Sequence, residues 1–501
     1  MKASSRRRSG AREKVHPAFP VRRAWGRAKR RGESTVRARI ARHGMTKALN
    51  NDLMISVSGV RGIVGRSLTP ELIVRLGQAY ATYIRSGRVV VGRDTRVSGE
   101  MVKHALFSGL LSAGCAIQDV GIVSTPTATL MIEHLKADGG VVISASHNPV
   151  EWNALKFFRA DGLYLNADEG RDLLNIYYGG DFIRVKWDGL LPVENVPDAE
   201  SHHVERVLKI IDADRIRARK FRVALDCCNG AGVGVSLRFL RALGCQVEPI
   251  HCTPDGRFPH TPEPNFVNLQ DLCRFTKECG AHIGFATDPD GDRVAAVSEH
   301  GDFLGEELSL ALTARHMLPR SKSATKRIVI NMSTSRVIED IAAEAGAEVI
   351  RTAVGEINVA ERMKETKAVF GGEGNGGVMD PRVHCGRDAI VGMGLLLEYL
   401  ACSEKPVSQL AAELPAWHML KTKLEIPTAQ SREIIRRLKA EAPTARANTE
   451  DGLRLDWDDG WVHLRASNTE PVLRIIAEGR TPERAQQLVQ EYTELIQTLK
   501  R

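Results

Sequence analysis

Long apolar runs, paired cysteines and a secretory signal are all missing from this chain of 501 residues. No apolar stretch reaches the roughly 18 residues that span a bilayer, because the richest one, residues 392–401, is interrupted by Glu398. The N-terminus is basic but lacks the apolar segment that a secretory signal needs. The nine cysteines form no C-x-x-C pair, which argues against zinc sites and a disulfide framework. We therefore expect a cytoplasmic protein with no membrane partner.

The composition is that of a folded protein with several domains. Hydrophobic residues make up 43% of the chain and charged residues 26%, which excludes disorder of the whole chain. At roughly 100–200 residues per domain, the length predicts about three to five domains.

The formal net charge of +9 is unevenly distributed. Residues 1–44 contain 15 Lys and Arg and only two acidic residues, a net charge of +13, so residues 45–501 carry −4. The basic segment has no helix or strand periodicity, and we expect residues 1–50 to be a disordered basic extension. Three interpretations of residues 1–44 stay open: an upstream start codon wrongly chosen, an organelle transit peptide, or an arm that binds nucleic acid. The acidic body argues against a nucleic-acid partner.

Strand-like and helix-like segments follow each other in the same order three times. Each repeat reads as a βαβ unit, so three α/β domains of similar topology are predicted. In such units the loops after the strands meet on one side of the sheet, where ligand sites are built. The predicted strand, helix and strand are 88–91, 99–113 and 116–123 in the first unit, 222–225, 233–243 and 246–251 in the second, and 327–331, 335–345 and 348–351 in the third.

The last 80 or so residues have a different pattern. Short strands at 453–457, 461–464 and 472–477 precede a helix that opens at Thr481-Pro482, an N-cap followed by Pro at N1. We expect a linker near 403–415, and the whole chain divides into α/β domains at 51–200, 201–302 and 303–410 and an α+β domain at 411–501. The expected apolar stripe of the last helix is Leu488, Tyr492, Leu495 and Leu499.

The segment 141–149 ends a buried strand in Ser144-Ala145-Ser146-His147-Asn148-Pro149. Because Asn-Pro favours a turn, we expect the Ser146 hydroxyl to be exposed at the end of the strand, with His147 beside it. An ordinary Ser turn in a loop is the alternative for a lone serine. Lys156 adds a cation ten residues later.

Asp288, Asp290 and Asp292 alternate in Asp-Pro-Asp-Gly-Asp-Arg, a spacing that fits a tight loop and not one face of a helix. Three carboxylates in such a loop can converge on one hard cation and would otherwise repel each other. An EF-hand needs Gly where Arg293 stands, and the flanking segments resemble strands, so that interpretation fails. A solvated acidic turn remains the alternative.

A glycine-rich loop, residues 371–377, presents Glu373 and Asn375 after the apolar run 368–370. No helix pattern follows, which makes a dinucleotide-binding site a weak interpretation. One carboxylate and one amide suit the directional contacts of sugar hydroxyls, while a plain flexible loop is the alternative.

Cationic loops form the last group of candidates. Residues 465–474 combine two arginines, two hydroxyls and an amide, a donor set that matches the oxygens of a phosphate group. Taken singly, Arg61 and the Arg93-Asp94-Thr95-Arg96 segment suggest surface salt bridges. A nucleophile, a cation loop, a polyol loop and a phosphate loop together indicate phosphoryl transfer to or from a phosphorylated sugar.

The segments S-A-S-H-N-P, D-P-D-G-D-R, G-E-G-N-G-G and R-A-S-N-T-E-P, in this order, resemble those of the α-D-phosphohexomutase family. The resemblance runs from about Ile55 to the C-terminus. It implies an α/β fold with four domains around a central cleft, of which the first three share one topology. It also implies small-molecule sugar phosphates as partners, and it leaves open whether the protein is a monomer or a homodimer.

The family resemblance further implies a role for each motif. Ser146 would carry a phosphoryl group, which passes to a sugar 1- or 6-phosphate and returns from a sugar 1,6-bisphosphate intermediate. Mg²⁺ would bind Asp288, Asp290, Asp292 and an oxygen of the phosphoserine. Arg61, His147, Lys156 and Arg293 would line the reaction centre, with Lys156, at a lowered pKa, as a candidate proton carrier. Sugar hydroxyls would be bound by Glu373 and Asn375, and the phosphate that does not react by Arg465, Ser467, Asn468, Thr469 and Arg474.

Two departures from the family pattern bear on mechanism and substrate. Gly377 stands where many members have a histidine, so the general base is not assigned by the resemblance. The segments 56–62 and 152–154 are most similar to bacterial members called phosphoglucosamine mutases, which implies conversion of glucosamine 6-phosphate to glucosamine 1-phosphate. Glucose or mannose phosphates are the alternative substrates, and a non-catalytic sugar-phosphate-binding protein is a further alternative that the intact Ser146 and aspartates argue against.

Overall fold

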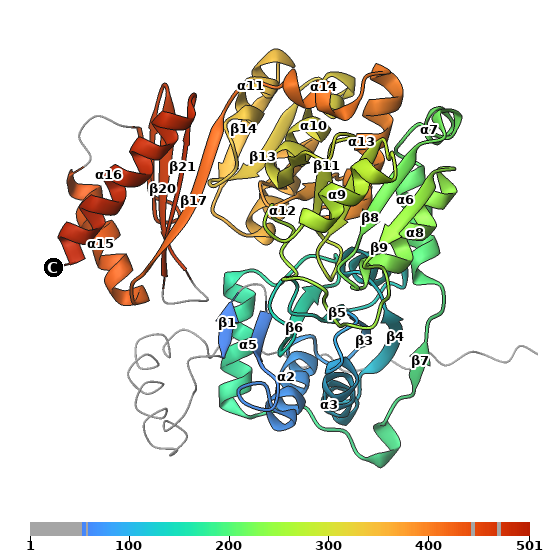
Figure 1. Cartoon of the computed structure of the whole chain (residues 1–501). Coiled ribbons are helices and arrows are strands. Elements are labelled where there is room, and N and C mark those ends of the chain that lie inside the picture. The colour runs from blue at the N-terminus through green and yellow to red at the C-terminus, as the bar shows by residue number, and fades with distance from the viewer. Residues whose placement is uncertain (1–52, 57–58, 442–445, 468–471, 501) are drawn as a thin grey trace, which may run out of the picture. The chain divides into compact units, whose positions relative to one another are not determined.

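The computed structural model describes residues 53–56, 59–441, 446–467 and 472–500. The whole extension that is predicted to be disordered, residues 1–50, therefore lies outside the described residues. The described part contains four separate β-sheets, each built from one continuous stretch of the chain (Figure 1).

The first sheet is mixed, with the strand order β1-β2-β6-β5-β3-β4-β7. Neighbours among β3, β4, β5 and β7 are parallel, whereas β6 runs antiparallel to both β5 and β2. Its strands are β1 (Met54–Ser56), β2 (Gly59–Ile63), β3 (Arg88–Arg93), β4 (Ala116–Ile122), β5 (Gly139–Ile143), β6 (Trp152–Arg159) and β7 (Val193–Asn195). The helices of this part are α2 (Pro70–Tyr83), α3 (Gly99–Ser112), α4 (Thr125–His134), α5 (Ala167–Gly179) and a 3-10 turn at Trp187–Gly189.

The second and third sheets repeat the centre of the first. The second has the order β12-β11-β10-β8-β9 and the third the order β14-β13-β15-β16. The second consists of β8 (Arg222–Asp226), β9 (Gln246–Ile250), β10 (Ile283–Thr287), β11 (Val294–Val297) and β12 (Phe303–Leu304), with helices α6 (Ala199–Leu208), α7 (Ala213–Arg219), α8 (Gly232–Ala242) and α9 (Gln270–Glu278). The third consists of β13 (Arg327–Asn331), β14 (Glu348–Thr352), β15 (Phe370–Glu373) and β16 (Gly377–Met379), with α10 (Gly305–Arg320), α11 (Val337–Glu344), α12 (Glu356–Thr366), α13 (Ala389–Ser403) and α14 (Val407–Ala412).

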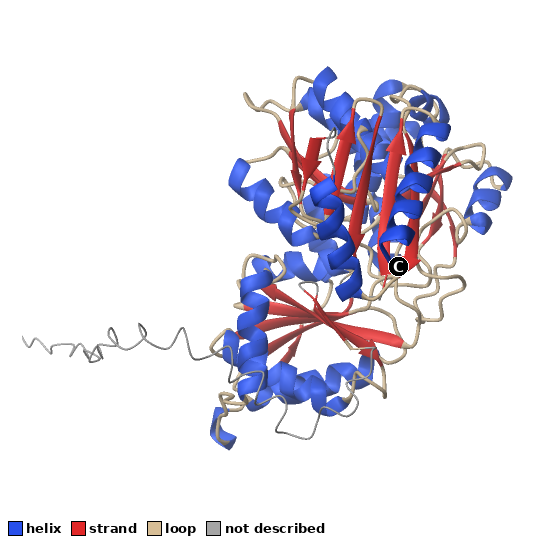
Figure 2. Cartoon of the chain, turned by 90° about the vertical axis from the view of Figure 1, so that its left-hand side faces the viewer, coloured by secondary structure: helices blue, strands red, loops and turns tan. Residues whose placement is uncertain are grey.

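One topological unit is therefore present three times. In each unit a first strand (β3, β8 or β13) lies between two parallel strands, and the second of these continues into an antiparallel strand. The strands and helices predicted for the three repeats are found within a few residues of their predicted ends. Figure 2 shows the strands of these sheets packed among helices, as expected for α/β layers.

Local sequence signals explain where several helices begin. Ser124 caps α4 by accepting a hydrogen bond from the backbone N–H of Thr127, and Asp388 caps α13 by accepting bonds from Ile390 and Val391. Within the predicted linker at 403–415, α14 forms a short helix, because Val407 and Leu410 pack into the core shared by the second and third sheets.

The fourth sheet is antiparallel throughout, with the order β17-β21-β20-β19-β18. Its helices α15 and α16 cover a core of its own, and Leu488 and Tyr492 of the predicted stripe are buried there, whereas Leu495 and Leu499 are only partly buried. The elements are β17 (His418–Glu425), α15 (Thr428–Glu441), β18 (Arg446–Asn448), β19 (Leu453–Trp457), β20 (Gly460–Ala466), β21 (Val472–Gly479) and α16 (Pro482–Lys500).

Two predictions from what the sequence lacks can be compared with the described residues. All nine cysteines lie among them, and each is a free thiol. No helix in the described part of the chain is both long and apolar enough to cross a membrane.

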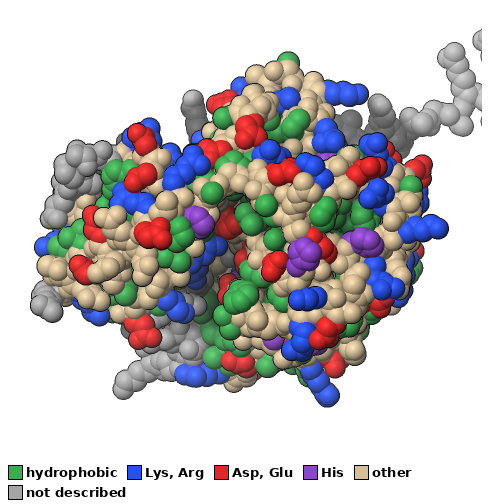
Figure 3. Space-filling model, turned by 45° about the horizontal axis from the view of Figure 1, so that its top comes forward, with side chains coloured by type: hydrophobic (Ala, Val, Ile, Leu, Met, Phe, Trp, Pro, Cys, Tyr) green, Lys and Arg blue, Asp and Glu red, His purple; other side chains and the backbone are tan. Residues whose placement is uncertain are grey.

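The face shown in Figure 3 is hollowed, and acidic and basic side chains are visible inside the hollow.

Candidate active site

Three of the four motifs occupy the same position in the three repeated units. In each unit, the motif is the loop between the last parallel strand and the antiparallel strand that follows it. These loops are residues 144–151 between β5 and β6, 288–293 between β10 and β11, and 374–376 between β15 and β16. Because ligand sites of α/β sheets lie at the carboxyl ends of parallel strands, the repeated topology presents all three loops at suitable positions.

The side chain of Ser146 lies at a contact between the first two of these loops. Its Oγ donates a hydrogen bond of 2.7 Å to Oδ2 of Asp288, and it lies 3.3 Å from Nδ1 of His147. Ser146 has a φ of +50°, in the left-handed region, and it is only 2% exposed. The prediction of an exposed hydroxyl is therefore wrong, because the aspartate loop of the second sheet covers it.

Arg96 fixes the backbone of the Ser146 loop. Its guanidinium is fully buried and donates hydrogen bonds to the carbonyl oxygens of Ser146 at 2.6 Å and Asn148 at 2.7 Å. The same group pairs with the carboxylate of Asp94 at 3.1 Å. The prediction of a surface salt bridge at Asp94 and Arg96 is wrong, because both side chains are inaccessible to solvent and Arg96 binds the backbone of the Ser146 loop.

The carboxylates of Asp288, Asp290 and Asp292 converge, with one oxygen of each lying within 4.8 Å of the others. All three residues are buried. Oδ1 of Asp290 and Oδ1 of Asp292 accept no hydrogen bond from any described residue. Burial and the charges of Asp292 and Asp290 raise the pKa of Asp288 well above its usual range. These oxygens fit a hard divalent cation, which would satisfy the orphaned acceptors and remove the repulsion.

Lys156 comes from β6 of the first sheet and pairs with Oδ2 of Asp290. Thr125, at the N-terminus of α4, donates its hydroxyl to the same oxygen at 2.6 Å. Burial alone would lower the pKa of Lys156, but the charge of Asp290 outweighs it and raises that pKa. The lowered pKa expected for Lys156 is therefore wrong for this arrangement, in which the amine is an ammonium ion held by Asp290.

Three further cationic or titratable side chains surround Ser146. The guanidinium of Arg61 donates to Oδ1 of Asn148 at 2.9 Å, while its buried Nε has no hydrogen-bond partner among the described residues. The Nε of Arg293 is also buried and lacks such a partner, 3.7 Å from Oδ1 of Asp292. Burial, with the nearby charges of Arg293 and Arg61, lowers the pKa of His147 well below its usual range, so its imidazole is neutral. Guanidinium groups with an N–H that makes no hydrogen bond suit an anion such as a phosphoryl group.

Arg387 connects the aspartate loop to the glycine-rich loop. Its guanidinium lies 2.5 Å from Oδ2 of Asp292 and 2.9 Å from Oε2 of Glu373, and its Nε is 3.1 Å from Oε2 of Glu356. Burial opposes the charge on Arg387, but these three carboxylates raise its pKa well above the usual value. One buried cation therefore holds carboxylates of the second and third units together.

Glu373 of the glycine-rich loop already accepts most of the hydrogen bonds that its carboxylate can accept. Oε1 of Glu373 accepts from Asn331 at 2.8 Å and from the backbone N–H of Gly355 at 3.0 Å, and Oε2 accepts from Arg387. A carboxylate oxygen accepts about two hydrogen bonds, so Oε2 retains one place for a ligand donor. Asn375 is half-buried, and its Oδ1 accepts from the N–H of Gly377 at 3.3 Å, which leaves its amide N–H₂ free to donate.

The fourth motif lies at the turn between β20 and β21. Arg465 and Arg474 are directly opposite each other on these antiparallel strands, a like-charge pair that is unfavourable unless an anion or an acid lies between them. Arg465 pairs with Asp451 at 2.7 Å, and Ser467 is buried at the end of β20. The predicted phosphate-binding residues Asn468 and Thr469 lie outside the described residues.

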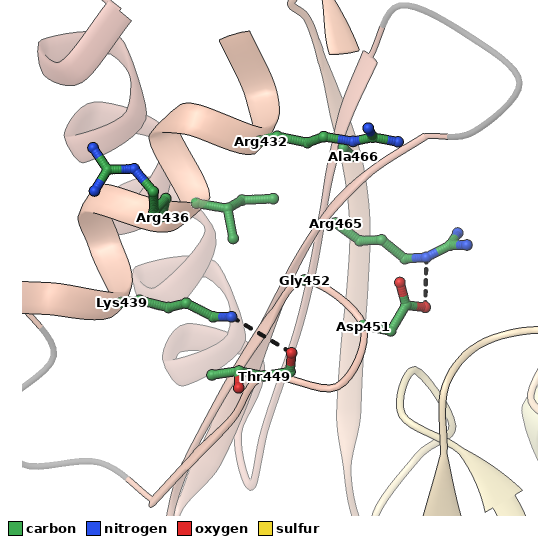
Figure 4. Close-up of a pocket in the computed structure, with 9 residues that line it drawn as sticks. Arg432, Arg436, Lys439, Thr449, Asp451, Gly452, Arg465 and Ala466 are labelled. Atoms are coloured by element: carbon green, nitrogen blue, oxygen red, sulfur yellow. Dashed lines mark hydrogen bonds and ion pairs between the residues drawn. The ribbon is translucent and has the colours of Figure 1, made fainter. Parts of the chain in front are cut away.

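A shallow pocket of about 270 Å³ lies beside this turn (Figure 4). Arg432, Arg436 and Lys439 of α15 line one side, and Arg465 lines the other with its partner Asp451. Among the described residues that line the pocket, Asp451 is the only acid, and four are basic, so this part of the fourth sheet attracts anions.

Sequence reasoning missed several residues that the structure brings to the site. Thr125 could have been found, since Ser124-Thr125-Pro126 after a strand is a helix-start signature. Asp388 could also have been found, because an Asp directly before the apolar stretch 389–401 is a typical helix N-cap. Nothing in the sequence distinguishes the adjacent Arg387 from a surface arginine.

Comparison with known proteins agrees with this arrangement. The chain matches the profiles of phosphoglucomutase/phosphomannomutase alpha/beta/alpha domain I over residues 53–184, domain II over 201–301 and domain III over 306–417, and that of the C-terminal domain over 423–495. The chain belongs to the phosphoglucomutase/phosphomannomutase family. The family resemblance and the four-domain α/β fold class are confirmed, and the protein is a phosphohexomutase, an intramolecular phosphotransferase.

Relatives of this phosphohexomutase carry more than one substrate name. A "Probable phosphoglucosamine mutase" of Methanopyrus kandleri is 38% identical over 88% of this chain and 96% of its own length. A "Phosphoglucomutase/phosphomannomutase" of Thermococcus kodakarensis is 39% identical over 87% of this chain and 96% of its own length.

Solved structures show the same fold. A phosphoglucomutase/phosphomannomutase family protein of Burkholderia thailandensis superimposes with a TM-score of 0.77 and 28% identity, covering 89% of this chain and 98% of its own. An Aspergillus fumigatus N-acetylphosphoglucosamine mutase, solved in complex with GlcNAc-6P and magnesium, shares the fold at a TM-score of 0.54 and 14% identity over 90% of this chain and 96% of its own.

Proposed function

We propose that this phosphohexomutase interconverts glucosamine 6-phosphate and glucosamine 1-phosphate through a phosphoserine at Ser146 and a bisphosphorylated sugar. The observation that carries the proposal is the 2.7 Å hydrogen bond from Oγ of Ser146 to Oδ2 of Asp288. This contact supports the proposal because a phosphoryl group on Oγ would lie next to the carboxylates to which we assign the divalent cation.

The reaction needs one oxygen–phosphorus bond to break and another to form in each half. In the first, the phosphoryl group leaves Oγ of Ser146 and bonds to a free hydroxyl of the sugar monophosphate, and the proton of that hydroxyl ends on Oγ. In the second, the other phosphoryl group of the bisphosphate bonds to Oγ, and the proton of Oγ ends on the sugar oxygen that this group leaves. Asp288, Asp290 and Asp292, with an oxygen of the phosphoserine, would hold Mg²⁺, which supplies neutralisation of the charge on the transferred group.

The protein's own cations act on the same group. The buried Nε–H groups of Arg61 and Arg293 make no hydrogen bond to a described residue, and the charges of both guanidinium groups act on His147. We therefore assign these two arginines to the oxygens of the transferred phosphoryl group. Lys156 and His147 complete the lining of this reaction centre.

The sugar and its second phosphate are assigned to the third and fourth domains. Glu373 has one acceptor place and Asn375 two amide donors for sugar hydroxyls, so each can fix the orientation of the ring. Arg465 and Arg474, opposed on neighbouring strands, would share the non-reacting phosphate with Ser467, Asn468 and Thr469. One fixed phosphate clamp allows either end of the sugar to face Ser146 in turn.

The choice of glucosamine phosphate rests on similarity in segments 56–62 and 152–154 and on the name of the Methanopyrus kandleri relative. The name of the Thermococcus kodakarensis relative favours glucose and mannose phosphates as the second candidate. A pocket that distinguishes such sugars needs only one contact, because a hydroxyl left without its partner costs several kcal/mol.

The test is a coupled mutase assay of the full chain on glucosamine, glucose and mannose 6-phosphates, with Mg²⁺ and a catalytic amount of the matching 1,6-bisphosphate. We expect the highest kcat/KM for glucosamine 6-phosphate and no turnover in Ser146→Ala. Intact-mass spectrometry should find one phosphate, about 80 Da, on the wild type and none on the variant. Equal activity of Ser146→Ala would refute the phosphoserine, and a higher kcat/KM for another sugar would refute the substrate.

A further inference from the structure

A second cluster of potential metal ligands lies in the second domain, outside the proposed reaction centre. Asp226 is the last residue of β8, His251 follows β9 directly, and His260 lies nine residues further along the next loop. One ligand atom of each lies within 4.8 Å of the other two. These residues come from neighbouring parallel strands and the loop after them, so the fold, and not sequence proximity, brings them together.

The separations in this cluster resemble those around a four-coordinate ion. Oδ2 of Asp226 lies 2.8 Å from Nδ1 of His251 and 3.3 Å from Nε2 of His260. Ligands at about 2.05 Å from a tetrahedral Zn²⁺ ion are about 3.3 Å apart. The separation between Asp226 and His260 matches this value, and the separation between Asp226 and His251 is about 0.5 Å shorter. Asp226 is 1% exposed, and the two rings are 24% and 15% exposed.

The hydrogen bonding of His260 indicates that a cation belongs between the ring and the carboxylate. Its Nδ1 lies 2.9 Å from the carbonyl oxygen of Thr261, a contact that only a protonated Nδ1 can make. A neutral His260 therefore directs the lone pair of Nε2 at the carboxylate of Asp226, an arrangement of two acceptors that needs a proton or a metal ion between them.

The contact to Thr261 also corresponds to the outer hydrogen bond typical of metal-ligating histidines. Such residues usually donate their second ring N–H to a carbonyl or carboxylate, which fixes the tautomer and the orientation of the ring. Oδ1 of Asp226 is held similarly, because it accepts from the N–H of Cys228 at 2.8 Å. Asp226 and His260 are thus oriented by hydrogen bonds of Oδ1 and Nδ1. These bonds do not use Oδ2 of Asp226 or Nε2 of His260, the atoms that would bind an ion.

We propose that Asp226, His251 and His260 form a binding site for Zn²⁺, separate from the aspartate cluster. Two imidazoles and one carboxylate suit this borderline ion and are poor ligands for Mg²⁺, which prefers oxygen. The absence of C-x-x-C pairs argues only against cysteine-based zinc sites, and this donor set has no comparable sequence spacing.

The site would secure a loop that supports the Ser146 region. Between His251 and His260, Gly256 packs against the backbone of Thr95, and the ring of Phe258 lies 4.9 Å from the guanidinium carbon of Arg96. A metal ion joining both ends of this loop to β8 closes it, which reduces the freedom of a segment that covers Arg96.

Zinc binding by the full chain tests the proposal without relying on activity. The protein is stripped with a chelator, saturated with Mg²⁺, mixed with Zn²⁺ and passed through a desalting column, and the retained zinc is measured by atomic emission. The compared chains are the wild type, His251→Gln, His260→Gln, and the control His300→Gln, which changes a histidine of the same domain whose side chain is 68% exposed.

We expect about one Zn²⁺ per chain in the wild type and in His300→Gln, and at least tenfold weaker binding in each of the other two variants. Hydrogen exchange of residues 252–260 should slow on addition of Zn²⁺ only in the chains that bind it. The proposal would be overturned if the wild type retained no zinc. It would also be overturned if His251→Gln and His260→Gln retained as much zinc as the wild type. Asp292→Asn separates the two clusters: loss of the zinc in that variant alone would place the ion at the aspartate cluster and also overturn it.

Discussion

Arg96 offers the sharpest test of how the Ser146 loop is held. Its guanidinium is completely buried and donates to the carboxylate of Asp94 and to four backbone carbonyls of residues 146–152. Arg96→Met keeps much of the volume but leaves Asp94 charged and unpaired in the interior. Breaking a buried ion pair from one side costs about 3–5 kcal/mol.

The cost should appear first as opening of the Ser146 loop. Since 1.4 kcal/mol is a factor of ten, about 3–5 kcal/mol corresponds to an increase in the opening equilibrium of roughly a hundredfold to a few thousandfold. The assay is hydrogen exchange measured by mass spectrometry on peptides covering residues 139–159, with peptides of β19 to β21 as the internal reference. We expect faster exchange in the first set only.

Arg93→Met is the matched control. Arg93 is the last residue of β3, three positions before Arg96, but its partner Glu100 is 53% exposed, and such surface pairs contribute at most about 1 kcal/mol. If Arg96→Met exchanged no faster than Arg93→Met in residues 144–152, the reasoning that the buried guanidinium organises this loop would be refuted.

Three further predictions concern other parts of the enzyme. Burial lowers the pKa of His463 to about 4, below the roughly 6.5 of an unfolded chain. The unfolded chain therefore binds a proton first as the pH falls from 6.5 towards 4, and this group costs the folded protein about 2 kcal/mol of stability between pH 7 and pH 5. His463→Gln should remove that loss, read from hydrogen exchange of β20 at the two pH values. Arg387→Met leaves three buried carboxylates without their shared cation, and we expect kcat/KM to fall at least a hundredfold and the protein to lose about 3–5 kcal/mol of stability in urea unfolding. Chelation of divalent ions should reduce turnover more than a hundredfold, with recovery on addition of Mg²⁺.

Each of these has a result that would contradict it. If the stability of β20 fell as much between pH 7 and pH 5 in His463→Gln as in the wild type, another group would cause the acid sensitivity. Wild-type kcat/KM in Arg387→Met would show that the bridge between Asp292 and Glu373 has no part in turnover. Full activity in the chelated enzyme would remove the basis for the cation at the aspartate cluster.

The repeated fold could be predicted from sequence because its signals are local. Strand 222–226, helix 232–242 and strand 246–250 follow from β-branched runs, helical periodicity and a glycine between them. The aspartate loop could be predicted equally well, because Asp residues that alternate with Pro and Gly fit a tight loop whose carboxylates converge on a cation.

Burial at the site could not be predicted, because it depends on how domains meet. Ser146 looks like an exposed turn residue in its own segment, and only the aspartate loop, 142 residues away in sequence, covers it. For the same reason Arg96 resembled a surface arginine. Nothing local marks Arg387 as the partner of carboxylates from two other segments.

The backbone at Ser146 limits which hydroxyl amino acid can stand there. Threonine has the same functional group and can carry a phosphoryl group, but a β-branched side chain at a φ of +50° is a steric outlier. Ser146→Thr, which changes one methyl group, should therefore shift the loop and misplace the oxygen relative to Asp288. The conformation of the backbone at this position therefore favours serine over threonine, before reactivity is considered.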